Sequence, residues 1–276
     1  MTTAQPELTV PPLASVGRVT QLRVLASEWT KLHSLRSTRW SMLVAIFLTM
    51  ALPTLFAAVT ASHWSHMTPH ERADRHPIEI ATAGVNLSQL AIAVLGVLVI
   101  TGEYSTGMIR ASFTAVPKRL PVLWAKIAVF AAATFALVVG PVVASFFISQ
   151  AILRNHHILQ ISFSHPGVAR SVFGGALFLV LVGLFAMAIG AIVRNTAGGI
   201  ATFAGLFFVI PPLMNLLPTS WQNDISPYLP DAAARDIFSL THGAHDLAPG
   251  SGLLVFCGYL ALAIAVAAVL LVRRDT

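Results

Sequence analysis

The stretch VFGGALFLVLVGLFAMAIGAIV, residues 172–193, contains no charged and no polar side chain. At about 1.5 Å of rise per residue, a helix needs roughly 20 apolar residues to cross the hydrocarbon core of a bilayer, and this run is long enough. Its residues are apolar at consecutive positions, whereas a transmembrane strand would alternate apolar and polar residues. The stretch therefore predicts a membrane-spanning α-helix.

Five further runs meet the same criterion. The chain of 276 residues is 56% hydrophobic and only 10% charged, whereas soluble proteins carry about 25% charged residues. The mean hydropathy is +0.77, and a surface so poor in polar groups must face lipid. We predict an all-α polytopic membrane protein with six transmembrane helices. The other five runs are residues 40–60, 81–100, 122–148, 198–217 and 253–272.

Residues 1–39 are too long and too polar for a signal peptide, and no cleavage site follows the first apolar run. We expect residues 1–17 to form a disordered tail and residues 18–39 an amphipathic helix at the membrane interface. Charged residues such as Glu28 and Lys31 lie mostly off its apolar stripe, although the segment could equally be a simple anchor. The stripe consists of Leu22, Leu25, Trp29 and Leu32.

The distribution of Lys and Arg predicts the orientation of the transmembrane domain, residues 40–276. Twelve of these residues fall on the side of the termini and of a loop at residues 101–121, and five fall on the other side. The excess predicts cytoplasmic termini and an external loop at residues 218–250. We expect the protein to lie in the cell membrane. The basic residues at the membrane boundaries also explain the net charge of +6. We therefore expect these residues to contact lipid and not nucleic acid.

Several kinds of active site are missing from the sequence. It contains no phosphate-binding loop and no dinucleotide-binding fingerprint, and its one cysteine, Cys257, excludes an internal disulfide. Among the Asp, Glu, Lys, Arg and His residues, only Lys126 lies in an apolar run, near the start of the third. Ion-driven transporters place such residues inside the membrane. We therefore predict no catalytic residue, no bound cofactor and an energy source outside this chain. The uncharged polar residues within the runs include Asn86, Ser88, Gln89 and Asn215.

The third run carries a small residue at every fourth position. A row of this kind lets another helix approach closely, either within the chain or as a dimer or pathway-lining face. The row, which we call the small-residue row, consists of Ala128, Ala132, Ala136, Gly140 and Ala144.

Nine of the ten histidines fall in the predicted external loops. The spacing of His63, His66 and His70 could suit a zinc ion. No cysteine supports them, so we expect solvated loop histidines and no metal site.

The stretch TGEYSTGMIRASFTAVPKRL, residues 101–120, forms the loop between the second and third runs. Its residues from Glu103 to Arg110 can form about two helical turns, which would put these two residues on one face. An ordinary basic loop is the alternative. The pattern Glu103-Tyr104-x-x-Gly107-x-x-Arg110, followed by Pro117-x-Arg119 and by Ala125-Lys126, resembles the membrane subunit of type-2 ABC exporters.

The resemblance implies a permease subunit that forms a translocation path and couples to a separate ATPase subunit. In that family the segment between spans two and three is a cytoplasmic coupling helix that docks on the ATPase, and it would here involve Glu103, Tyr104, Gly107 and Arg110. ATP and magnesium would bind to the partner, and a second permease copy or a sister subunit would complete the exporter. A non-transporting membrane scaffold or sensor, which only recruits a protein to its loops, is the alternative function.

Overall fold

The computed structural model describes residues 20–34, 36–73, 75–107, 119–158, 160–241, 243 and 245–273. Every regular element in these ranges is helical. Six helices are long and apolar enough to cross a bilayer, which confirms the predicted all-α chain and indicates a multi-pass membrane protein. The spans are Ser37–His66, Pro77–Ser105, Leu120–Asn155, Val168–Val193, Thr196–Met214 and Pro249–Arg273.

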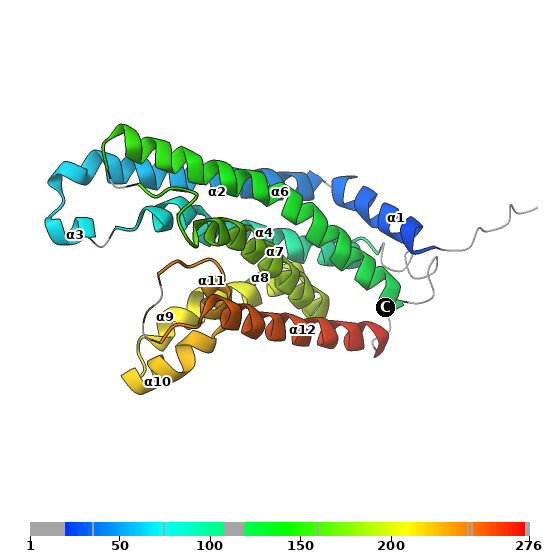
Figure 1. Ribbon diagram of the computed structural model, residues 1–276. Coiled ribbons are helices and arrows are strands. Elements are labelled where there is room, and N and C mark those ends of the chain that lie inside the picture. Colours follow the sequence, from blue (N-terminus) through cyan, green and yellow to red (C-terminus); the bar gives the residue numbers. More distant parts are fainter. Residues whose placement is uncertain are drawn as a thin grey trace, which may run out of the picture.

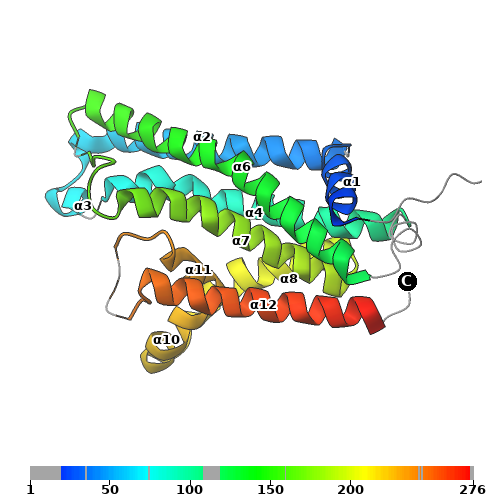
Figure 2. The ribbon, with the colours of Figure 1, turned by 45° about the vertical axis from the view of Figure 1, so that its right-hand side comes forward.

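The helices of the six spans form three layers (Figures 1 and 2). Helices α2 (Arg36–His63) and α6 (Arg119–Asn155) form one outer layer, α4 (Pro77–Ser105) and α7 (Val168–Val193) the middle one, and α8 (Thr196–Ala204) and α12 (Pro249–Arg273) the other. Helix α1 (Gln21–Ser34) and the last residues of α12 lie at the same end of the bundle, which we call the α1 end.

The middle layer is the core of the bundle because α4 and α7 approach each other closely. A Cβ atom added to Gly96 of α4 would lie 2.3 Å from the carbonyl oxygen of Gly183 on α7. Small residues at such a crossing bring backbones together, and dispersion contacts then stabilise the pair. In the most apolar part of α7, 78% of the residues are buried, against 22% in the first span. The predicted run at residues 172–193 is thus a central helix.

The fourth and fifth spans are joined by only two residues, Arg194 and Asn195. Arg194 has a φ of 57° and ends α7, while the side chain of Asn195 accepts a hydrogen bond from the Gly198 amide at 2.9 Å and begins α8. The fifth span then continues through a π-helical segment, Gly205–Val209, into α9 (Ile210–Met214). This span ends at Met214, three residues before the predicted run does.

The opposite end of the bundle carries the shorter helices. Elements η1 (Trp64–His66) and α3 (Pro69–Ala73) connect α2 with α4, and the segment before α12 contains α10 (Thr219–Ile225), η3 (Ser226–Tyr228) and α11 (Pro230–Asp236). Arg170 of α7 donates hydrogen bonds to the carbonyl oxygens of Ile237 and Ser239 at 3.1 and 2.9 Å. This side chain therefore fastens the segment after α11 to the core.

Candidate functional site

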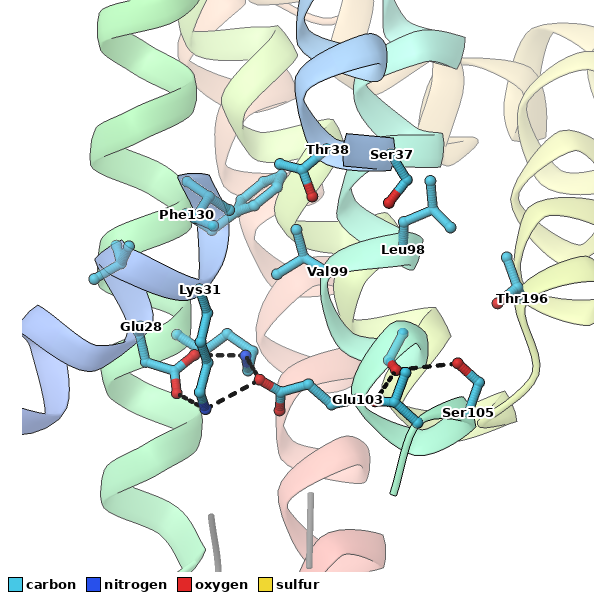
Figure 3. Close-up of a pocket in the computed structure, with 15 residues that line it drawn as sticks. Glu28, Lys31, Ser37, Thr38, Leu98, Val99, Glu103, Ser105, Phe130 and Thr196 are labelled. Atoms are coloured by element: carbon cyan, nitrogen blue, oxygen red, sulfur yellow. Dashed lines mark hydrogen bonds and ion pairs between the residues drawn. The ribbon is translucent and has the colours of Figure 1, made fainter. Parts of the chain in front are cut away.

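Four charged side chains from three helices meet at the α1 end. Glu103 lies in the last turn of α4, Lys126 lies near the beginning of α6, and Glu28 and Lys31 lie on α1. Because Glu28 and Lys31 are three residues apart, they lie on the same side of α1. We call these four residues the charge cluster. Figure 3 shows Glu28, Lys31 and Glu103 turned toward one another.

Each carboxylate of the charge cluster binds both ammonium groups. Glu28 Oε1 lies 2.6 Å from Lys31 Nζ, and Glu28 Oε2 lies 2.5 Å from Lys126 Nζ. Glu103 Oε1 lies 3.1 Å from Lys31 Nζ and 2.9 Å from Lys126 Nζ. The four ion pairs form a closed ring, which ties α1 to the facing ends of α4 and α6.

The charge cluster is withdrawn from water. The exposed fractions of the Glu28, Glu103 and Lys126 side chains are 4%, 6% and 6%, and only Lys31 is more open at 21%. Burying an ion costs several kcal/mol unless an opposite charge and hydrogen bonds compensate it. Two carboxylates and two ammonium groups cancel, so the cluster is electrically neutral only as a complete set.

The pKa values on α1 reflect this pairing. Burial alone would raise the pKa of Glu28, but the ammonium groups of Lys126 and Lys31 outweigh burial and hold it below the ordinary value of 4.5. Burial alone would lower the pKa of Lys31, but the carboxylates of Glu28 and Glu103 raise it above 10.5. Both side chains are therefore charged at neutral pH.

A cavity of about 240 Å³ lies beside the charge cluster (Figure 3). Glu103 and Lys126 line its polar part, and Leu98, Val99 and Phe130 line its apolar part. The cavity is bordered by α1, α2, α4 and α6 and by Thr196, the first residue of α8. It can thus hold a molecule with one polar and one apolar end.

Two further contacts attach the same end of α4 to the third layer. The Thr101 and Thr196 hydroxyl oxygens lie 2.7 Å apart, which links α4 to α8. The Arg194 guanidinium lies 5.0 Å from the centre of the Tyr104 ring, and it also donates a hydrogen bond to the Leu270 carbonyl oxygen of α12 at 3.2 Å. The neighbouring residues Glu103 and Tyr104 therefore contact opposite layers of the bundle.

The predicted coupling segment is not one continuous helix. Glu103 and Tyr104 belong to the last turn of α4, which ends at Ser105, and Gly107 follows with a φ of 71°. A residue in this left-handed conformation ends a helix, and glycine adopts it without a steric penalty. The interpretation of residues 103–110 as two helical turns is therefore wrong at Gly107. Arg110 lies outside the described residues.

Helix α1 buries a different face from the predicted apolar stripe. Leu32 of the stripe is buried and Leu25 is half-buried, but Leu22 and Trp29 are 77% and 48% exposed. Glu28, which sequence reasoning left off the stripe, is buried. Sequence reasoning therefore missed the charge cluster. The signal that could have found it is a set of opposite charges at the boundaries of neighbouring apolar elements.

The rest of the described chain leaves most of the small-residue row uncovered. Four of its members are exposed and Ala144 is half-buried, and a Cβ atom added to Gly140 would meet no atom within 4 Å. The row therefore does not serve packing within the described bundle. Its exposure leaves room for a helix of another chain or for lipid.

Two polar residues in the middle of α4 differ in their hydrogen bonding. The Ser88 hydroxyl accepts a hydrogen bond from Thr49 of α2 at 2.8 Å. Gln89 is fully buried, and its amide group hydrogen-bonds to none of the residues that the structure describes. Within the described ranges, no three His, Cys, Asp or Glu side chains are arranged to hold a metal ion. His63, His66 and His70 lie within these ranges and form no such group.

Neither protein-family models nor curated proteins match this sequence.

Proposed function

We propose that the chain is the permease subunit of an ATP-driven exporter of the type-2 ABC class. A separate ATPase subunit, which binds ATP and magnesium, would dock on the segment between α4 and α6. A second permease copy or a sister subunit would complete the path for a hydrophobic or amphipathic cargo. The residue pattern from Glu103 to Lys126 suggests the class.

The observation that carries this proposal is the position of the charge cluster. The segment between α4 and α6 joins two helix ends that both contribute to the cluster, through Glu103 and Lys126. A partner that displaces this segment would pull on both helices, and the ion pairs would transmit the displacement to α1. Tyr104 and its contact with Arg194 would extend the displacement to the third layer. The site is therefore suited to transmit a movement of the partner to the transmembrane helices.

The test is co-expression of the chain with candidate ATPase subunits from the same genome, followed by affinity purification and an ATP hydrolysis assay in liposomes. We expect a stable complex whose hydrolysis rate exceeds that of the ATPase alone. Arg110→Ala should weaken the complex and the stimulation. Arg154→Ala, an exposed residue at the opposite end of α6, is the matched control.

Two results would contradict the proposal. If Glu103→Ala and Arg110→Ala leave both binding and stimulated hydrolysis unchanged, the segment has no coupling role. If a partner binds but sealed vesicles show no vectorial movement of hydrophobic or amphipathic compounds, the alternative function of a scaffold or sensor gains support.

A further inference from the structure

The cavity beside the charge cluster lies at the level where the membrane spans end. Ser37 and Ser105, the first residue of the first span and the last of the second, line the cavity and are exposed. Phe130 on its apolar side is only 1% exposed. A cavity of about 240 Å³ greatly exceeds the roughly 10–15 Å³ that one water requires. Its volume, position and mixed lining suit the head of an amphipathic molecule from the bilayer.

The charge cluster retains hydrogen-bonding capacity toward this cavity. Both ion pairs of Glu103 use Oε1, and its Oε2 accepts no hydrogen bond from the described residues. Lys126 donates to Glu28 and Glu103, and an ammonium group has a third N–H. Both residues line the cavity. The site thus offers one charged acceptor and one charged donor to the same ligand.

The net charge of the charge cluster selects the ligand. Because the two negative and two positive charges of the cluster already cancel, a ligand with a net charge would leave that charge uncompensated in a largely buried site. A zwitterionic head that carries both an ammonium and a phosphate adds no net charge. Its ammonium can donate to Glu103 Oε2, and its phosphate can accept from Lys126.

We propose that this cavity binds the headgroup of one phosphatidylethanolamine molecule, whose acyl chains begin beside Leu98 and Phe130. The proposal concerns a resident lipid and goes beyond the export function. It also differs from what the basic composition suggests, since Lys and Arg at membrane boundaries ordinarily attract anionic lipids.

The wild-type protein provides the first test. Purified, delipidated full-length chain is offered equal amounts of dioleoyl phosphatidylethanolamine, phosphatidylcholine and phosphatidylglycerol, and retained lipid is counted by native mass spectrometry. We expect one phosphatidylethanolamine per chain. Retention of phosphatidylcholine should be about tenfold weaker because its quaternary nitrogen has no N–H to donate. Equal or stronger retention of phosphatidylglycerol overturns the proposal.

A pair of variants on α4 tests the location. Leu98→Trp fills the cavity without altering a charge, and Leu90→Trp adds the same bulk to an exposed position of the same helix. We expect Leu98→Trp to lose the bound phosphatidylethanolamine and Leu90→Trp to retain it. Equal retention by both variants would show that the lipid binds elsewhere.

A charge variant tests the headgroup chemistry. Glu103→Gln leaves two ammonium groups facing one carboxylate, so the site gains one positive charge. The preferred lipid should then change from phosphatidylethanolamine to phosphatidylglycerol, and an unchanged preference would refute the role of neutrality. Because no ATPase takes part in these measurements, their failure would leave the export function untouched, and failure of the export function would leave the lipid site untouched.

Discussion

Lys126 Nζ lies 2.9 Å from Glu103 Oε1, and this ion pair joins the beginning of α6 to the end of α4. The two residues are 23 positions apart in sequence, and the segment between the two helices connects them. The same ammonium group also binds Glu28 of α1. One side chain thus holds three helices together at the end where we propose that a partner binds.

Lys126→Met should destabilise the protein strongly, because Glu28 and Glu103 would share a single ammonium group in a buried site. Removing one member of a buried ion pair costs about 3–5 kcal/mol. The measurement is the thermal denaturation midpoint in detergent. Arg154→Met, at the exposed opposite end of α6, is the control and should stay within about 0.5 kcal/mol of the wild type. Equal midpoints for the two variants would refute the structural role of the cluster.

The stability of the protein should fall with acidification below about pH 4.5. The folded-state pKa of Glu28 is lowered from 4.5, so its contribution is present above that value and is lost as pH falls through the folded pKa. The pKa of Lys31 is raised from 10.5, so Lys31 stabilises the folded state fully below pH 10.5. This stabilisation is lost as pH rises through the folded-state pKa of Lys31. The denaturation midpoints of the wild type and of Glu28→Gln should approach each other as the pH is lowered. If the difference between the two midpoints grows instead, ionised Glu28 does not stabilise the fold.

Gly107→Val should impair the link between α4 and the segment that follows it. A residue other than glycine in the left-handed conformation costs roughly 1–2 kcal/mol, although a Cβ atom at Gly107 would meet nothing within 4 Å. We expect reduced partner-stimulated ATP hydrolysis. Gly102→Val tests the same bulk inside α4, where a Cβ atom also meets no neighbour, and it should retain more stimulation. The opposite order would show that the turn at Gly107 is unimportant.

Gly96→Ala should separate the two central helices. The added methyl group would lie 2.3 Å from the Gly183 carbonyl oxygen, and overpacking of this kind costs about 1–3 kcal/mol. The matched control is Gly140→Ala in the small-residue row, where a Cβ atom meets nothing within 4 Å. Thermal denaturation should show a lower midpoint for Gly96→Ala alone. A comparable loss in Gly140→Ala would mean that the row packs against another chain.

Gln89→Leu and Ser88→Ala should change stability in opposite directions. Replacing the buried amide of Gln89, which has no hydrogen-bond partner among the described residues, with an apolar side chain removes a desolvation cost of about 1–3 kcal/mol. Ser88→Ala removes the hydrogen bond between the Ser88 and Thr49 hydroxyls and should cost about 1 kcal/mol. Denaturation midpoints above and below the wild type, respectively, are expected. A destabilised Gln89→Leu would indicate that the amide has a partner, such as a buried water.

The spans were predictable from sequence because each apolar run is long and contains few charged or polar residues. The charge cluster could not be predicted in the same way, because hydrophobic periodicity does not show which face of α1 packs against the other helices. In a lipid environment apolar side chains such as Leu22 and Trp29 can stay exposed, while Glu28 turns inward to Lys126. The missed burial of Glu28 thus reflects a contact across 98 residues of sequence, which no local pattern contains.

The end of α4 shows the same limit at shorter range. The charged and polar residues after Ile100 predicted that the second span stops there and that a separate short helix begins at Glu103, yet α4 continues to Ser105. Glu103 finds its counter-charges on α1 and α6, so it can remain helical and buried. Gly107 marks the real boundary through its backbone conformation.

The two-residue connection between α7 and α8 has a practical consequence for topology mapping. Arg194 and Asn195 fill this hairpin completely, and the Arg194 side chain is anchored on α12. An epitope or reporter inserted here would separate the fourth and fifth spans and disturb the fold. If such an insertion were not detected, the result would therefore not show on which side of the membrane the connection lies. The fourth and fifth spans are therefore expected to move together as one rigid unit, because the connection between them is too short to act as a hinge.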